Sequence, residues 1–142
     1  MSDIVQLTAC NCFATRQAAR HITRLFEKHL DGAHLTSAQF SIIVSLDEKK
    51  EMSMNELSAA LVMDRTTLLR ALKPLQRDGL LKSQPNKQDT RQLLLSLSRE
   101  GQHRLRIAAR LWQDAQREFE EQIKASRAAH MRRDLLAVSQ SA

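Results

Sequence analysis

The 142-residue sequence is poor in residues that turn or break a chain, with three glycines and two prolines. That scarcity argues against an all-β protein, which needs many turns, and against a disordered chain. No run approaches the roughly 20 apolar residues of a membrane-spanning helix, and the N-terminus lacks the charged-then-apolar order of a signal peptide. We therefore expect a mainly helical, cytoplasmic protein of one domain's size, with no membrane partner.

Cysteine is also scarce, and tyrosine is absent. Cys10 and Cys12 cannot form the disulfide framework of a small secreted protein. On one helix they would point about 200° apart, so they could neither bridge each other nor chelate one metal. The histidines show no metal-ligand spacing, and no nucleophile elbow or glycine-rich phosphate loop occurs. The sequence thus predicts no enzyme, no metal and no cofactor. Inert cysteine is the favoured interpretation, and a thiol switch stays open.

Positive charge is in excess, with a net charge of +6 and a pI near 9.9. Such a balance favours a polyanionic partner without identifying it. The distribution is more informative, because residues 64–91 hold seven Lys or Arg against three Asp and so carry +4 of the +6. A polyanion is therefore expected to meet this segment.

Residues 53–79 read as two short helices joined by a tight turn. Ser53 and Glu56 have the capping-box spacing, and Asp64 is a good N-cap for the second helix. At about 100° per residue, the apolar and polar residues of the second helix fall on opposite faces. The apolar face holds Leu68, Ala71, Leu72 and Leu75, and the polar face holds Thr66, Arg70, Lys73 and Arg77. A second helix with outward hydroxyls and cations is typical of a recognition helix in the DNA major groove.

A β-hairpin is predicted next, with strands over residues 80–84 and 92–97. Leu93, Leu95 and Leu97 are expected on one face of its second strand. The loop between the strands is polar, cationic and rich in turn residues. Within it Asp89 is predicted to pair with Arg91 and shape the tip, which leaves Lys87 and part of Arg91 for nucleic acid. A hairpin wing of this kind suits phosphate or minor-groove contact.

Long helices are predicted at both ends of the chain, over residues 4–30, 98–123 and 127–138. The first carries an apolar face and, opposite it, an arginine stripe that reads most simply as solvated. Together these helices carry more apolar surface than so small a winged domain can cover. Surplus apolar stripes at both ends suggest a bundle between two subunits.

Four short motifs occur together along the chain. They are Asp64-Arg65-Thr66-Thr67, Arg77-Asp78-Gly79-Leu80, the wing D-x-R of Asp89 and Arg91, and Leu97-Ser98-Arg99-Glu100-Gly101. With these motifs and its flanking helices, nearly the whole chain resembles the MarR family of winged helix-turn-helix transcriptional regulators. The resemblance implies a mainly α fold with a small β-hairpin wing and terminal helices that form a dimerisation bundle. Pro74 departs from the pattern, because it removes a backbone donor to Arg70 and predicts a bend.

The resemblance further implies a repressor that binds a pseudo-palindromic double-stranded DNA operator as a homodimer. Residues 1–34 would form the N-terminal dimerisation helix, 35–100 the DNA-binding domain and 101–142 the C-terminal dimerisation helices. Hydroxyls and guanidinium groups near the start of a recognition helix can reach base edges in the major groove. Direct base contacts are assigned to Arg65, Thr66, Thr67 and Arg70, and phosphate or wing contacts to Lys73, Arg77, Lys87 and Arg91.

Regulation by a small molecule is also implied. Members of this family bind a small, often aromatic or phenolic anion between the dimer helices and the winged part, which releases DNA. Candidate contacts in this chain are Arg16, His21 and Trp112, although a solvated arginine and packing residues are the simpler interpretations. The alternative is a redox-sensing regulator that uses Cys10 or Cys12. MarR-like peroxide sensors hold a first-helix cysteine with tyrosine hydroxyls, which this chain lacks.

Overall fold

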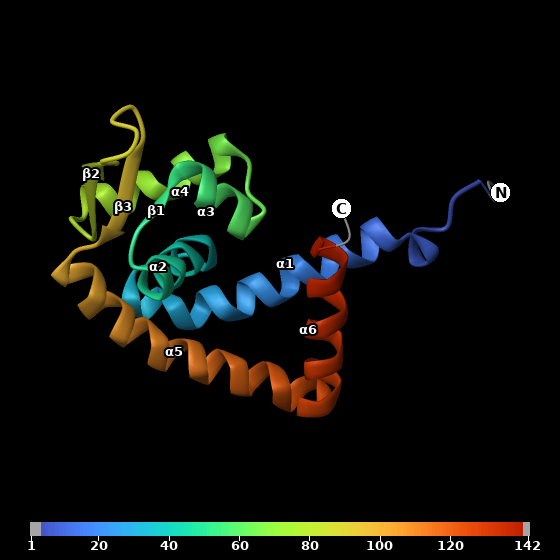
Figure 1. Ribbon diagram of the computed structural model, residues 1–142. Coiled ribbons are helices and arrows are strands. Elements are labelled where there is room, and N and C mark those ends of the chain that lie inside the picture. The colour runs from blue at the N-terminus through green and yellow to red at the C-terminus, as the bar shows by residue number, and fades with distance from the viewer. Residues whose placement is uncertain (1–3, 141–142) are drawn as a thin grey trace.

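The structure is a computed structural model that describes residues 4–140 (Figure 1). It is mainly helical with one small antiparallel sheet, as the sequence predicts. The elements are α1 (Asn11–Leu30), α2 (Ser37–Lys49), β1 (Met52–Ser53), α3 (Met54–Leu61), α4 (Arg65–Arg77), β2 (Leu81–Pro85), β3 (Leu93–Leu97), α5 (Arg99–Ile123) and α6 (Ala125–Gln140). None of the helices within the described range has the length and apolar character needed to cross a lipid bilayer.

Side chains at the helix starts explain where several helices begin. Thr36 and Gln39 form a capping box at the start of α2, and Ser53 and Glu56 form another at α3. Ser98 accepts a hydrogen bond from the Gly101 N–H at the start of α5. Each cap satisfies backbone donors that have no partner within the helix. The helix start predicted from the spacing of Ser53 and Glu56 is confirmed.

The start of α1 differs from the prediction. The first helix was expected from residue 4, but Leu7–Ala9 form a separate 3-10 turn and α1 begins at Asn11. Cys10 has an extended backbone and acts as the N-cap, with its Sγ accepting a hydrogen bond from the Phe13 N–H at 3.4 Å. The two cysteines therefore do not lie on one helix. Cys10 is half-buried and Cys12 is exposed.

The sheet has three strands in the order β1-β3-β2, so β3 is central. The β2–β3 hairpin is the predicted wing, and its register pairs Leu81 with Leu97 and Pro85 with Leu93. As expected, Leu93, Leu95 and Leu97 alternate along β3 and so lie on one face of the strand, but Leu93 is 51% exposed whereas Leu95 and Leu97 are buried. Leu93 pairs with Pro85 at the end of the hairpin that adjoins the wing loop.

The main core joins the helix-turn-helix to the sheet and to the helices that flank it. Its fully buried side chains include Ile42, Ile43, Leu57, Leu68, Leu72 and Leu75. Leu68, Leu72 and Leu75 occupy the predicted inner face of α4, so its polar face is turned outward. Burying a side chain of this size stabilises the fold by about 1.5–3 kcal/mol.

A second, smaller cluster connects the terminal helices. Leu25 of α1, Phe119 of α5 and Ala128 of α6 are buried together there. Figure 1 shows α1 and α5 diverging from the winged part, with α6 closing the space between them. Apolar side chains toward both chain ends stay exposed, among them Ile4, Val5, Leu7, Leu135, Leu136 and Val138.

Candidate nucleic-acid interface

The recognition helix α4 is fixed at its first turn by Asp64. The Asp64 carboxylate accepts hydrogen bonds from the Thr67 N–H at 2.7 Å and from the Thr67 hydroxyl at 3.0 Å. These bonds hold the pKa of Asp64 below its usual range, with a smaller contribution from the Arg70 charge. Because the Thr67 hydroxyl proton is used by the cap, Thr67 can meet a base edge only as an acceptor. Thr66 is exposed, and its hydroxyl has no hydrogen-bond partner among the described residues.

Removing this cap is expected to loosen the start of the recognition helix. At neutral pH, Asp64→Ala should lower both the midpoint of urea unfolding and the affinity for duplex DNA, whereas Asp64→Asn should keep most of both, since Asn caps almost as well as Asp. The pKa of Asp64 is lower in the folded protein than in the unfolded chain. The stabilisation by its ionised carboxylate is therefore complete above the unfolded pKa and is lost as the pH falls through the folded pKa. Equal losses in the two variants would contradict a capping role.

The outer face of α4 is cationic and open. Arg65, Arg70, Lys73 and Arg77 are all exposed. Arg77 forms an ion pair with Asp78 at 3.3 Å, and the other three form no ion pair with a described side chain. An exposed pair contributes little free energy, so Arg77 is easily released to an anion. The helix runs through Pro74 without a break, and the predicted bend stays a prediction.

The end of α4 determines how the wing follows the recognition helix. Gly79 has a φ of +72°, and the Leu80 N–H donates to the Leu75 carbonyl while the Gly79 N–H donates to that of Gln76. This pair of bonds is a Schellman motif, which ends a helix at a glycine and redirects the chain. The Ser98 hydroxyl donates to the Gly79 carbonyl at 2.7 Å, which ties the start of α5 to the same corner.

The tip of the wing is held by its own side chains. Asp89 Oδ1 accepts hydrogen bonds from the Arg91 N–H at 3.2 Å and from Arg91 Nε at 3.3 Å. Asn86 Nδ2 donates to Gln92 Oε1 at 2.8 Å across the hairpin. The predicted pairing of Asp89 with Arg91 is confirmed. Since Arg91 uses Nε for this pair and its side chain is 91% exposed, its terminal nitrogens remain accessible.

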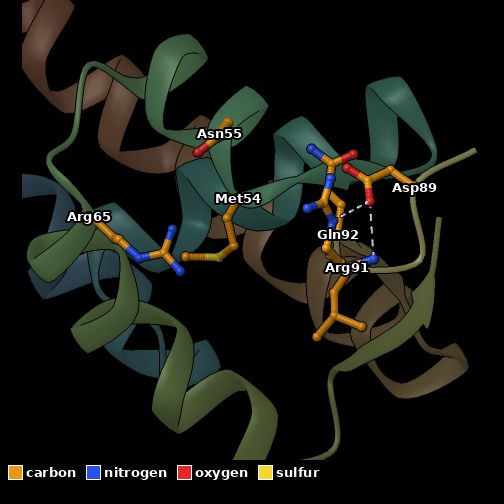
Figure 2. A pocket seen from close by; sticks show the side chains of 7 residues that line it. Met54, Asn55, Arg65, Asp89, Arg91 and Gln92 are labelled. Atoms are coloured by element: carbon orange, nitrogen blue, oxygen red, sulfur yellow. Dashed lines mark hydrogen bonds and ion pairs between the residues drawn. The ribbon is translucent and has the colours of Figure 1, made fainter.

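A cleft of about 330 Å³ separates the helix-turn-helix from the wing (Figure 2). It is lined by Met54, Asn55, Arg65, Asp89, Arg91, Gln92 and Leu93. Figure 2 shows Arg65 reaching in from α4 on one side and the Asp89–Arg91 pair on the other. The structure thus brings together two predicted cations from segments far apart in the sequence. Asn55 was missed, because an amide in the first turn of α3 carries neither charge nor periodic signal.

The three candidate ligand residues do not come together. Trp112 lines an apolar cavity between α1, α2 and α5. His21 lies instead on an exposed groove of α1 with Arg20 and Arg24, and Arg16 is exposed on the same helix without lining either space. The expectation that Arg16 and His21 act with Trp112 at one site is therefore not supported by the geometry.

Comparisons with known proteins agree with this geometry. The MarR family profile matches residues 35–93. The chain is 31% identical to the transcriptional regulator MosR of M. tuberculosis, solved in complex with DNA, with a TM-score of 0.81 over 93% of this chain and 95% of that one. It is 25% identical to a cysteine-to-serine variant of MarR from E. coli complexed with operator DNA, with a TM-score of 0.84 over 96% and 99% of the two chains.

A relative of known role was found in Bacillus subtilis. The organic hydroperoxide resistance transcriptional regulator of that organism is 27% identical over 99 residues, which are 70% of this chain and 67% of the relative. Across the curated relatives that it matches, the chain spans 46% to 67% of their length.

Proposed function

We propose that this chain, which belongs to the MarR family of DNA-binding transcriptional regulators and is not an enzyme, is a repressor that binds a pseudo-palindromic operator as a homodimer. A small ligand would release it from the operator. The observation that carries this proposal is the outward cationic face of α4, placed beside a wing whose Arg91 faces the same cleft as Arg65. We expect the protein in the cytoplasm, since it must reach the chromosome.

The roles of the side chains follow from their positions. Residues near the start of α4 would enter the major groove, where Arg reads guanine bidentately and hydroxyls contact either base of a pair. Base contacts are proposed for Arg65, Thr66, Thr67 and Arg70, phosphate contacts for Lys73, Arg77 and Lys87, and a groove contact at the wing for Arg91, held by Asp89. Thr66 would carry more of the hydroxyl readout than Thr67, whose hydroxyl already donates a hydrogen bond to Asp64.

The cleft between α4 and the wing suggests one further contact. A recognition helix in the major groove and a wing at the neighbouring minor groove must straddle a sugar–phosphate strand. Arg65 and Arg91 line the two sides of the cleft that this strand would cross. Asn55 lies at the same cleft, in the first turn of α3, and would donate its amide protons to a phosphate.

A two-fold dimer accounts for the exposed apolar side chains toward the chain ends. Unpaired apolar faces of this kind mark association sites. We assign residues 1–34 and 101–142 to the dimer bundle and 35–100 to the DNA-binding part; residues 1–3 and 141–142 lie outside the described range. A two-fold axis through the bundle would present two recognition helices to half-sites about 34–36 Å apart.

Release by a ligand is proposed at the cavity that Trp112 lines. Its wall includes Phe26 of α1, Val44 of α2 and Leu61, the last residue of α3. A molecule bound there would touch both the terminal helices and the first helix of the helix-turn-helix. It would shift the DNA-binding equilibrium only as far as it binds the released state more tightly.

The proposed function is tested by titrating the full chain against a selected duplex and a scrambled duplex of equal length at physiological salt. We expect two chains per selected duplex, binding that is about 10³-fold or more tighter than to the scrambled one, and a strong decrease of affinity with salt. Equal affinity for the two duplexes would contradict the proposal.

A second candidate is a DNA-bound redox sensor that uses Cys10 or Cys12. It is favoured by the likeness to the B. subtilis hydroperoxide regulator and by the exposure of Cys12. In such a sensor the thiolate sulfur would attack hydrogen peroxide and break its O–O bond, which gives a sulfenic acid and a hydroxide ion that is protonated to water. The test compares operator affinity before and after mild peroxide in wild type, Cys10→Ser and Cys12→Ser. Loss of affinity in wild type that one serine variant abolishes would favour this candidate over the ligand.

A further inference from the structure

The cavity beside Trp112 has a chemical character that restricts what it can bind. Its volume is about 410 Å³, within the range of small-molecule sites. None of the described residues that line it is charged, and three of them are the aromatic side chains of Phe26, Phe40 and Trp112. The remaining wall is aliphatic except for hydroxyl groups, mostly from α2. These features favour an aromatic guest.

The serine hydroxyls that line the cavity already donate hydrogen bonds to acceptors within the protein. Ser41 Oγ donates to the Ser37 carbonyl at 3.0 Å, and Ser45 Oγ donates to the Ser41 carbonyl at 2.9 Å. Ser37 Oγ donates to Glu27 Oε1 at 3.1 Å. A hydroxyl carries one proton and two lone pairs, so all three serines are left with acceptor capacity only. The α2 wall of the cavity therefore accepts hydrogen bonds and does not donate them.

The start of α2 would ordinarily attract an anion, because its first N–H groups are unpaired and the helix dipole is positive there. In this chain that end is already occupied. Glu27 accepts a hydrogen bond from the Ser37 N–H at 3.1 Å, and Thr36 Oγ1 accepts one from the Gln39 N–H. The Glu27 carboxylate thus places a negative charge against the wall. A carboxylate ligand would meet this charge and the serine lone pairs without a lining cation to balance it.

We propose that the cavity binds a neutral aromatic molecule that donates a hydrogen bond, as an un-ionised phenol does, to the hydroxyl oxygens of Ser41 and Ser45. The inference rests on the proposed function for the site and departs from the aromatic anion that the family resemblance implies. The remaining donors of the lining, the Trp112 indole and the Thr23 hydroxyl, belong to exposed residues at the rim. They can serve a second polar group of the guest.

The test uses three probes of similar size and the full chain without DNA. 4-Ethylphenol is neutral and has a donor, 4-ethylanisole is neutral and has none, and 4-ethylbenzoate is an anion. Trp112 is the one tryptophan of the sequence, which has no tyrosine, so its emission, excited where the probes do not absorb, reports binding directly. We expect 4-ethylphenol to bind about tenfold more tightly than either of the others, the value of one good hydrogen bond.

The matched variants assign that preference to the serines. Ser41→Ala combined with Ser45→Ala should bind 4-ethylphenol and 4-ethylanisole equally, while Ser83→Ala, an exposed serine on the wing that does not line the cavity, should behave as wild type. Tighter binding of the benzoate, no binding of any probe, or a preference unchanged in the double variant would overturn the proposal. Release of the operator by 4-ethylphenol is measured in a separate experiment. If 4-ethylphenol binds with the expected preference but does not release the operator, this inference stands and the ligand-release part of the proposed function is refuted.

Discussion

Gly101→Ala is expected to destabilise the protein by about 1–3 kcal/mol or more, as overpacking of a closed core does. A Cβ at this buried position would overlap the Leu80 carbonyl oxygen and lie 3.3 Å from Leu97 Cδ2. The Leu80 carbonyl cannot retreat easily, because it accepts a hydrogen bond from the Ser98 N–H at 3.0 Å. Alanine is otherwise favoured over glycine within a helix by about 1 kcal/mol, so a net loss of stability would show that the overlap decides the outcome.

The other two glycines of the chain are the controls. At Gly32 a Cβ would meet only the flexible end of the Leu111 side chain at 3.1 Å, so Gly32→Ala should change stability little. At Gly79 nothing lies within 4 Å, but the positive φ should cost Gly79→Ala about 1–2 kcal/mol. Urea unfolding of the three variants measures the order. A Gly101→Ala protein as stable as Gly32→Ala would contradict the close approach of α5 to the end of the recognition helix.

Arg70→Ala is expected to weaken operator binding by on the order of 1–3 kcal/mol and to relax the sequence preference. Arg70 is exposed on the outer face of α4, one turn from the capped start, and it forms no ion pair with a described side chain. Its guanidinium can therefore reach a guanine edge, and its loss should be felt on the selected duplex more than on a scrambled one. Anisotropy titrations on the two duplexes measure both effects.

Lys87→Ala is the matched variant at the wing. Lys87 is exposed in the hairpin loop, where a flexible ammonium suits a phosphate. Its removal should weaken all duplexes alike and reduce the salt slope by about one. If Arg70→Ala and Lys87→Ala lower specific and random binding in the same proportion, the division between base and phosphate contacts is wrong.

Features of the fold set by neighbours in sequence were predictable. The caps at Thr36, Ser53, Asp64 and Ser98 depend on contacts three residues apart, which a spacing reveals. The start of α1 was not found, because a cysteine is a weak capping signal beside Ser, Thr or Asp. The two-residue strand β1 exists only through its pairing with Leu94 and Leu95, some forty residues away in the sequence, so no local pattern marks it.

Some features of the candidate sites could likewise be predicted from the local sequence, and others could not. Helical periodicity alone turns the cations of α4 outward, since the leucines of the opposite face are buried. The cleft that Arg65 shares with Arg91 depends on how the wing folds back, and so Asn55 could not be found from its own neighbours. Of the ligand candidates, Trp112 lines the cavity, and His21 does not for a geometric reason. Ile22 and Phe26 face the cavity, and His21 is turned about 100° away from Ile22 on the same helix.

In the proposed dimer two recognition helices, each paired with a wing, meet one duplex. Selection of bound duplexes from a random pool by the purified full chain is the experiment for this arrangement. We expect enrichment of an inverted repeat whose half-sites are about 10–10.5 base pairs apart, centre to centre. Recovery of sequences without a repeat, or no enrichment at physiological salt, would contradict it.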